Sequence, residues 1–277
     1  MSIECCYSNV TADNELPDER IEVSECQHVE NNTEITHNMI FVKCHIDKIL
    51  IYSNVHVIIL DVEHLVRRQF SGLNHVKRPN LLIIGVSAIS RIYFTQVFPK
   101  TYYYLRYKNW AEYKVFNKLS NNNKINIAAM LTGRTYLELD YNTTHISNSP
   151  FIWTDFKKMG YITAYAKDSI DNGIARSHVQ SFREPPTDFY FRSYVIATHM
   201  LPKVMMNSSI YCTGPESTVE RILNVAKDYS TTFIGKSTFE ATLRIGDNKD
   251  SQYFNLVGKI KGLNKKLVSE ICEKERI

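Results

Sequence analysis

The sequence lacks any long hydrophobic run. Its longest apolar stretch, residues 55–60, has the length of a strand, far short of the roughly 18 residues that span a bilayer. The first residues, Met-Ser-Ile-Glu-Cys-Cys, also lack the basic and then apolar layout of a signal peptide. We therefore expect no membrane span in this chain and no signal peptide at its start.

The chain also has little excess charge and none of the common catalytic motifs. Its net charge is +4 over 277 residues, and Lys and Arg are scattered among acidic residues, which argues against a nucleic-acid partner. It contains no His-Glu-x-x-His pair, no Gly-x-Ser-x-Gly elbow and no Cys-x2-Cys spacing. These absences argue against the usual zinc-protease, serine-hydrolase and zinc-finger chemistries.

Cysteines and glycosylation sequons favour an oxidising compartment. There are six cysteines, four of them within the first 44 residues, and four Asn-X-Ser/Thr sequons in polar stretches that are typical of loops. We expect disulfides and an extracellular or secretory-pathway location, with a zinc site or reduced cytosolic thiols as alternatives. The cysteines are Cys5, Cys6, Cys26, Cys44, Cys212 and Cys272, and the sequons begin at Asn9, Asn31, Asn142 and Asn207.

Two domains are predicted. Residues 1–75 are turn-rich with short β-branched runs, which indicates a small, cysteine-rich, mainly β region with strands at 41–46 and 55–62. Residues 76–277 alternate between strand-like and helix-like segments, the pattern of an α/β domain with a mostly parallel sheet flanked by helices. The expected strands are 81–86, 112–116, 161–166 and 237–245, and the expected helices are 99–107, 126–131, 151–159, 187–200, 217–230, 250–261 and 263–275.

Residues 81–86 form a continuous apolar run, which predicts a strand covered on both faces. Ser90 follows as a possible helix N-cap.

Two aromatic runs, Tyr102-Tyr103-Tyr104 and Phe189-Tyr190-Phe191, have two interpretations: core packing, which such residues usually provide, or the wall of a ligand groove.

From residue 79 onward the motifs resemble a family. Pro-Asn-Leu-Leu-Ile-Ile-Gly at 79–85, Ser90-Arg91 and Pro-Lys-Thr at 99–101 are similar to the opening of animal ectoproteins grouped as domain of unknown function 229. Collinear matches continue at 117–118, 126, 131–133, 150–153, 160–161, 164–169 and 186–190, and the Cys-Cys-Tyr start also fits. The resemblance implies an alkaline-phosphatase/sulfatase-like core that uses divalent metal such as zinc or calcium.

The same resemblance implies that this chain carries other residues at the positions where the family has its metal ligands and nucleophile. Ser87 stands where the family carries a metal-binding Asp, and a neutral hydroxyl is a much poorer ligand than a carboxylate. Asn123 stands where superfamily analogy places a Thr nucleophile, and a carboxamide cannot accept a phosphoryl or sulfuryl group as an alkoxide can. Asp247 aligns loosely with a Ser-Leu-Ser/Thr-His-Asp motif that has lost its His. No counterpart of the family's later Asp-His-Gly segment precedes Ile277.

We therefore expect a non-catalytic, C-terminally shortened pseudoenzyme with no cofactor, which binds an unknown protein or an anionic ligand. The alternatives are a phosphate or sulfate ester hydrolase with compensated or missing segments, and a decaying duplicate without a molecular role. Asp168 matches the family motif but is expected to serve as a cap or buried hydrogen-bonding group. The candidate pocket left from the ancestral enzyme, hereafter the relict pocket, comprises Ser87, Ser90, Arg91, Asn122, Asn123, Asp168 and Asp247.

Overall fold

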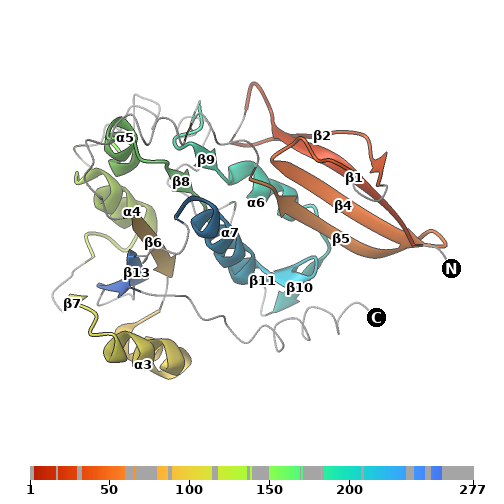
Figure 1. The fold of residues 1–277 in the computed structure, drawn as a ribbon. Coiled ribbons are helices and arrows are strands. Elements are labelled where there is room, and N and C mark those ends of the chain that lie inside the picture. Colours follow the sequence, from red (N-terminus) through yellow and green to blue (C-terminus); the bar gives the residue numbers. More distant parts are fainter. Residues whose placement is uncertain are drawn as a thin grey trace. The chain divides into compact units, whose positions relative to one another are not determined.

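The computed structural model describes residues 3–16, 18–29, 33–59, 65, 80–86, 89–113, 118–135, 138, 150–168, 170, 182, 184–206, 209–234, 240–246 and 251–257. Two compact units emerge (Figure 1). Unit 1 contains residues 1–74, 140–232 and 262–277, and unit 2 contains residues 75–139 and 233–261. The predicted domains 1–75 and 76–277 stay a prediction, although one boundary of unit 1 also falls at residues 74 and 75.

An antiparallel sheet opens unit 1. Its strands are β1 (Ile3–Ala12), β2 (Ile21–Val23), β3 (Gln27–His28), β4 (Met39–Ile46) and β5 (Ile49–Val57), in the order β2-β1-β4-β5 with β3 also paired to β1. Asp47 and Lys48 connect β4 to β5 with φ of 48° and 72°. Positive φ at both positions matches the twist that a two-residue hairpin loop requires. The sheet confirms strand structure at 41–46. Of the second predicted strand, 55–62, residues 55–57 belong to β5, whereas 60–62 lie outside the described residues.

Two disulfides connect strand β1 to strand β4 and to the segment that follows strand β2. Cys5 is bonded to Cys44, its direct partner on β4, and Cys6 is bonded to Cys26. Because adjacent strand residues point to opposite faces, the two bonds leave opposite sides of β1. Cys212 is also disulfide-bonded, whereas Cys272 lies outside the described residues.

The rest of unit 1 packs helices against this sheet. The elements are α5 (Ile152–Lys158), β8 (Ala164–Tyr165), β9 (Phe189–Tyr190), α6 (Arg192–Thr198), β10 (Lys203–Met206), β11 (Ser209–Thr213), β12 (Glu216–Ser217) and α7 (Thr218–Ile234). Helix α6 lies against β1 and β5 (Figure 1). The N-terminal sheet therefore shares one core with residues more than a hundred positions later: Val10, Phe41, Val55, Phe191, Tyr194, Val195, Ala197, Leu201 and Val225.

Unit 2 has a four-stranded sheet in the order β6-β13-β14-β7. Its elements are β6 (Leu81–Val86), α2 (Arg91–Val97), α3 (Pro99–Tyr107), β7 (Glu112–Tyr113), α4 (Asn123–Thr132), β13 (Glu240–Gly246) and β14 (Ser251–Val257). Strand β6 pairs in parallel with β13, and the other two pairings are antiparallel. The fold is mixed α/β as expected, but the described pairings do not confirm a mostly parallel sheet.

Three predictions were wrong: two on the type of secondary structure, and one on whether both faces of strand β6 are buried. Residues 250–261 were expected to be helical, but 251–257 form β14; the aromatic and β-branched residues Tyr253, Phe254 and Val257 favour a strand once β13 is available as a partner. Residues 187–200 contain strand β9 before the helix begins at Arg192. Strand β6 is covered on one face only, because Leu81 and Ile83 are 46% and 36% exposed while the alternate residues pack on α2 and α3. The expected helix at 263–275 lies outside the described residues.

None of the described helices is long and apolar enough to cross a membrane.

Candidate functional site

Helix α4 begins at the position that the family resemblance assigns to the nucleophile. Asn123 is the first residue of the helix, and its side chain is exposed, as is that of Asn122. The backbone N–H groups of a first helical turn have no partner within the helix and carry partial positive charge. The site thus keeps a favourable electrostatic setting for an anion, but Asn123 presents an amide in place of a hydroxyl.

The loop before α4 is held by the buried side chain of Asn126, which is 6% exposed. Asn126 Oδ1 accepts from the N–H groups of Leu119 and Ser120 at 2.8 and 3.0 Å, and Nδ2 donates to the carbonyls of Ser120 and Asn122 at 2.6 and 3.2 Å. One side chain therefore satisfies four backbone groups and fixes the approach to the helix. Asn126 is also a residue of the family motif.

Ser90 and Arg91 have structural contacts at the start of α2. The Ser90 hydroxyl accepts from the Tyr93 N–H at 3.0 Å, which confirms the predicted N-cap. Arg91 forms an ion pair with Glu112 in the strand β7. Both residues belong to unit 2, as do Asn122 and Asn123.

The described structure does not define where the remaining relict-pocket residues lie relative to this helix. Asp168 is exposed and belongs to unit 1. Ser87 and Asp247 lie outside the described residues. Among the described residues, no group of three or more His, Cys, Asp or Glu side chains is arranged to hold a metal ion. The described side chains therefore do not form the divalent-metal site that the family resemblance implies.

Another family-matched acid has a structural role in unit 1. Asp188 accepts from the backbone N–H and the hydroxyl of Thr163, both at 2.9 Å, and pairs with Lys157 at 3.2 Å. These bonds tie the start of β8 to the start of β9. Asp188, which lies in the matched segment 186–190, is thus a buried hydrogen-bonding residue.

Aromatic side chains surround this connection. The rings of Phe151 and Trp153 stack at 4.3 Å between centroids, and Trp153 packs against Tyr165 at 5.3 Å. Burial raises the pKa of Tyr165 to about 12. Tyr165 in turn stacks on Tyr190 at 6.0 Å. The matched motif at 150–153 therefore supplies core contacts.

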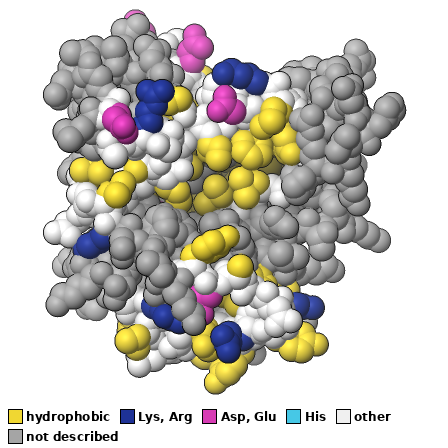
Figure 2. All heavy atoms as spheres, turned by 90° about the vertical axis from the view of Figure 1, so that its left-hand side faces the viewer, with side chains coloured by type: hydrophobic (Ala, Val, Ile, Leu, Met, Phe, Trp, Pro, Cys, Tyr) yellow, Lys and Arg dark blue, Asp and Glu magenta, His cyan; other side chains and the backbone are white. Residues whose placement is uncertain are grey.

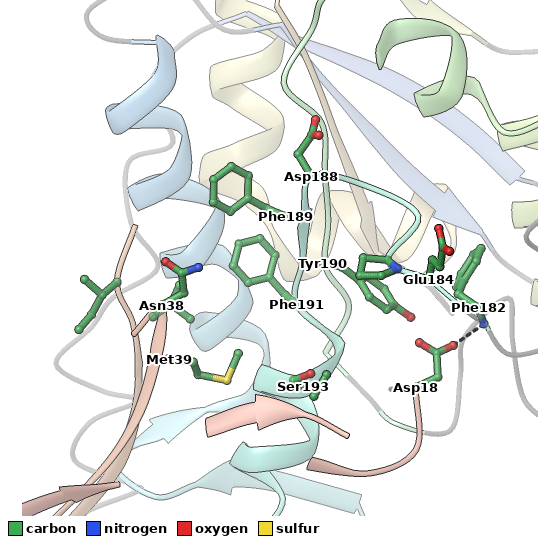
Figure 3. A pocket seen from close by; sticks show the side chains of 14 residues that line it. Asp18, Asn38, Met39, Phe182, Glu184, Asp188, Phe189, Tyr190, Phe191 and Ser193 are labelled. Carbon is green, nitrogen blue, oxygen red and sulfur yellow. Dashed lines mark hydrogen bonds between the residues drawn. The ribbon is translucent and has the colours of Figure 1, made fainter. Parts of the chain in front are cut away.

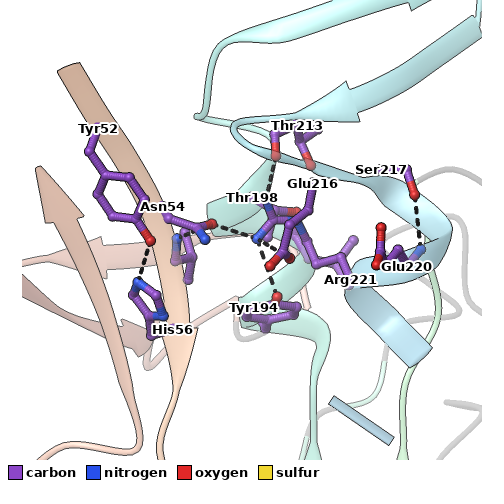
Figure 4. Close-up of polar contacts among 12 residues, drawn as sticks. Tyr52, Asn54, His56, Tyr194, Thr198, Thr213, Glu216, Ser217, Glu220 and Arg221 are labelled. Atoms are coloured by element: carbon purple, nitrogen blue, oxygen red, sulfur yellow. Dashed lines mark hydrogen bonds and ion pairs between the residues drawn. The ribbon is translucent and has the colours of Figure 1, made fainter. Parts of the chain in front are cut away.

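A buried arginine in unit 1 was not identified from the sequence. Arg221 on α7 is 2% exposed and donates to Asn54 Oδ1 at 2.7 Å, to the Tyr194 hydroxyl at 3.3 Å and to the Thr213 carbonyl (Figure 4). Glu216 lies 3.6 Å away and supplies the opposite charge. A buried guanidinium needs such partners because desolvation of a charge costs several kcal/mol. From the sequence, Arg221 was placed only within the predicted helix 217–230, and that prediction gave no indication that its side chain is buried.

His56 lies beside this arginine cluster. Its Nε2 is 3.0 Å from the Tyr52 hydroxyl. Burial lowers the pKa of His56, while Glu216 opposes and Arg221 reinforces that shift. The neutral imidazole is thus the form that the fold favours.

Surface charge gives no sign of a nucleic-acid interface on the face that Figure 2 shows. Described Lys and Arg side chains lie dispersed among acidic and hydrophobic ones. This dispersion agrees with the modest net charge of +4.

One of the four sequons, at Asn9, lies within the described residues. Asn9 lies within β1, opposite Ile40 of β4, and not in the loop that its polar neighbours predicted. Strand pairing with β4 overrides that local signal. The other sequons, Asn31, Asn142 and Asn207, lie outside the described residues.

Comparison with known proteins identifies a family. The family described as protein of unknown function (DUF229) matches residues 1–261. No curated protein and no solved structure matches the chain. The match covers nearly the whole chain, including the cysteine-bearing sheet and the helix α4 motif, and so the chain belongs to the DUF229 family.

Proposed function

We propose that this chain is a non-catalytic alkaline-phosphatase/sulfatase-like protein of the extracellular or lumenal space, and that it acts by binding a partner. The observation that carries the proposal is the start of helix α4. There the family residue with a structural role, Asn126, is present and makes four hydrogen bonds. The residue at the reactive position is Asn123, which has no hydroxyl.

The chemistry of the substituted positions supports a loss of turnover. An acceptor for a phosphoryl or sulfuryl group must form a covalent ester, which a carboxamide at Asn123 does not form. Ser87 offers a neutral oxygen where a divalent cation needs carboxylate charge. A nucleophile or a metal-binding carboxylate by itself typically accounts for several orders of magnitude in the rate. A chain that lacks both groups should therefore have little activity.

The parallel pairing of β6 with β13 supports an alkaline-phosphatase-like core. The two strands are distant in sequence, with Leu81 opposite Glu240. Parallel neighbours require a crossover connection, and the helices α2, α3 and α4 lie in the intervening sequence.

The disulfides support an oxidising location. Cys5–Cys44 and Cys6–Cys26 bond the first sheet on both of its faces. Such bonds persist outside the reducing cytosol. Export is tested by expression in a secreting eukaryotic cell behind a heterologous signal, followed by mass mapping of glycans at Asn9, Asn31, Asn142 and Asn207.

The decisive experiment measures metal content and turnover together. We expect the purified protein to hold less than one divalent ion per chain and to hydrolyse para-nitrophenyl phosphate and sulfate no faster than buffer. Two bound divalent ions together with turnover contradict the proposal. In that case Asn123→Ala is compared with Asn121→Ala, a neighbouring exposed residue outside the nucleophile position, to show whether α4 is the site.

Binding of an anion is tested separately. Inorganic sulfate and phosphate are titrated into isotope-labelled protein, and the amide resonances of residues 122–125 are followed. Shifts confined to these amides support an anionic ligand at the helix start. Their absence leaves a protein partner as the proposal, while poor solubility or rapid degradation of the whole chain favours the decaying-duplicate alternative.

A further inference from the structure

The two aromatic runs that the sequence left open between core and groove differ in the structure. In unit 1, residues 189–191 line a pocket (Figure 3). Phe191 is buried in the core, and Phe189 packs against the same cluster. Tyr190 lies on the opposite side of the strand, near the buried Asp18. The pocket therefore does not bring the buried acid and the two Phe rings to one side, and this run serves as core.

The run in unit 2 divides between the core and the surface. Leu105 of α3 is 3% exposed and packs on Phe94, and Tyr102 and Tyr104 pack against the same cluster. Tyr103, between them, is 70% exposed. The middle ring of this run therefore faces away from the core.

A second exposed tyrosine lies one helical turn further along α3. Tyr107 is 79% exposed and follows Tyr103 by four positions, while the exposed Lys100 precedes Tyr103 by three. Residues at these spacings share one face of a helix. Because the opposite face is anchored by Leu105, the three side chains form an outward row, hereafter the tyrosine stripe.

The tyrosine stripe is surrounded by positive charge. Arg106 and Lys108 adjoin Tyr107 in the sequence and are exposed, and the ammonium nitrogen of Lys108 lies 5.3 Å from the centre of the Tyr107 ring. Residues 92–111 contain Lys100, Arg106, Lys108 and no Asp or Glu. None of these three cations forms an ion pair with a described residue. The surface thus offers positive charge that a partner can neutralise.

The combination of tyrosine rings and a few cations favours a protein partner. Tyr buries a large area at a small cost in side-chain entropy, and Tyr and Arg are enriched where the binding energy of protein interfaces concentrates. Nucleic acids and sulfated polysaccharides depend on many contacts to phosphate or sulfate, for which three cations are few. An acidic protein segment requires fewer charges and can also cover the rings.

We propose that the tyrosine stripe is a docking surface for a partner protein, which binds through an acidic segment that also carries apolar side chains. Carboxylates of the partner pair with Lys100, Arg106 and Lys108, and its apolar side chains cover Tyr103 and Tyr107. Charge complementarity speeds association and fixes orientation, while burial of the rings supplies affinity. The surface includes no residue of the α4 start, so turnover of a phosphate or sulfate ester would contradict the proposed function without bearing on this docking surface.

Three labelled peptides test the charge preference on the unaltered full-length chain by fluorescence anisotropy. One carries phenylalanines spaced among glutamates, and in the other two glutamine or lysine replaces every glutamate. We expect the glutamate peptide to bind at least about tenfold more tightly than the glutamine peptide, and the lysine peptide to bind most weakly. Equal affinities, or no binding of the glutamate peptide at about 1 mM, overturns the proposal.

Two double variants locate the effect on α3. Tyr103→Ser/Tyr107→Ser removes the rings, and Lys100→Gln/Arg106→Gln removes two charges. Each should weaken binding of the glutamate peptide about tenfold, and only the first should leave its salt dependence unchanged. If the ring variant binds as tightly as the unaltered chain, the tyrosines are not part of the surface and the proposal is wrong.

Control substitutions lie in unit 1. Ile49→Ser, at a residue that is 69% exposed, and Lys158→Gln, at a side chain that is 72% exposed, should leave the affinity unchanged. Heparin fragments and vesicles that contain phosphatidylserine are titrated in parallel. If either binds more tightly than the glutamate peptide and depends on the same α3 residues, then an acidic protein segment is the wrong occupant. Should a variant fold poorly, the comparison of the three peptides on the unaltered chain still decides the outcome.

Discussion

Among the described residues, the polar side-chain contacts with the largest sequence separation lie in unit 1, whereas those of unit 2 join residues that are closer in sequence. In unit 1, Arg221 reaches Asn54 across 167 positions and Asp18 reaches Phe182 across 164. In unit 2, Ser90 bonds a residue three positions on, and Asn126 bonds the loop at most seven positions before it. The family residues of unit 2 thus shape a helix start locally, while unit 1 depends on groups that unite distant segments.

The two units can be followed separately because each contains one of the two tryptophans. Trp153 lies in unit 1 and Trp110 in unit 2. A Trp110→Phe background therefore reports unit 1, and a Trp153→Phe background reports unit 2. The first substitution should be mild, since the Trp110 indole N–H is buried without a partner among the described residues.

The largest effect is expected for Arg221→Met. Removing the guanidinium leaves the Thr213 carbonyl and Asn54 unsatisfied in the interior, which should lower the free energy of unfolding of unit 1 by about 3–5 kcal/mol. The measurement is urea unfolding followed by Trp153. Arg106→Met, at an exposed position on α3, is the matched control and should change unit 2 little. Equal effects of the two substitutions would remove the contrast between the units.

Removal of one disulfide should lower the stability of unit 1 slightly less. The Cys6→Ala/Cys26→Ala double variant opens a disulfide that spans 20 positions, which should cost unit 1 about 3 kcal/mol through the greater freedom of the unfolded chain. Urea unfolding of the Trp110→Phe form measures this. The transition followed by Trp110 in the other background should stay in place, and a parallel shift there would show that the two units unfold together.

Ser90→Ala should cost unit 2 about 1 kcal/mol, the usual value of an N-cap. The Tyr93 N–H loses its acceptor in this variant. Unfolding is followed by Trp110, and Ser90→Asp is the control because a carboxylate also caps a helix. If the two substitutions are equally harmful, then Ser90 contributes through packing and not through the cap.

The smallest effect concerns pH. The pKa of His56 in the folded protein is lowered below its ordinary value of 6.5, mainly by burial. The unfolded chain therefore binds more protons in the window below 6.5, so this contribution to stability is complete above 6.5 and is lost as the pH falls. His56→Gln retains a partner for the Tyr52 hydroxyl and should flatten the stability of unit 1 between about pH 7.5 and 5.5. An unchanged slope would mean that another group titrates there.

Local signals predicted much of the fold. The apolar run at 81–86 became β6, the serine at 90 became an N-cap, and the helices at 99–107 and 217–230 correspond to α3 and α7. These features depend on neighbouring residues and so are visible in short windows. The prediction of a helix at 250–261 was wrong, because the strand that forms at 251–257 depends on pairing with a partner strand that a short window of sequence does not contain.

Of the two candidate sites, one could be found from local sequence and the other could not. The resemblance at 117–126 identified the substituted Asn123 from local sequence, whereas the predicted helix 126–131 starts three residues after the observed start of α4 at Asn123. The tyrosine stripe could not be located, because the sequence left open which rings of 102–104 face the core, and that depends on how the helix packs. Nor did the aromatic run at 189–191 distinguish a core from a groove, since that depends on what packs against it.

The sequence alone determined the family, the replaced reactive residues and most of the elements, because each of these is encoded within a short stretch of chain. Only the tertiary structure decided the cysteine pairing, the burial of Arg221 and the hydrogen bond that Asp18 accepts from Phe182. The disulfides join residues 39 and 20 positions apart, and the contacts of Arg221 with Asn54 and of Asp18 with Phe182 span 167 and 164 positions. Their energies belong to the assembled core and to no single segment.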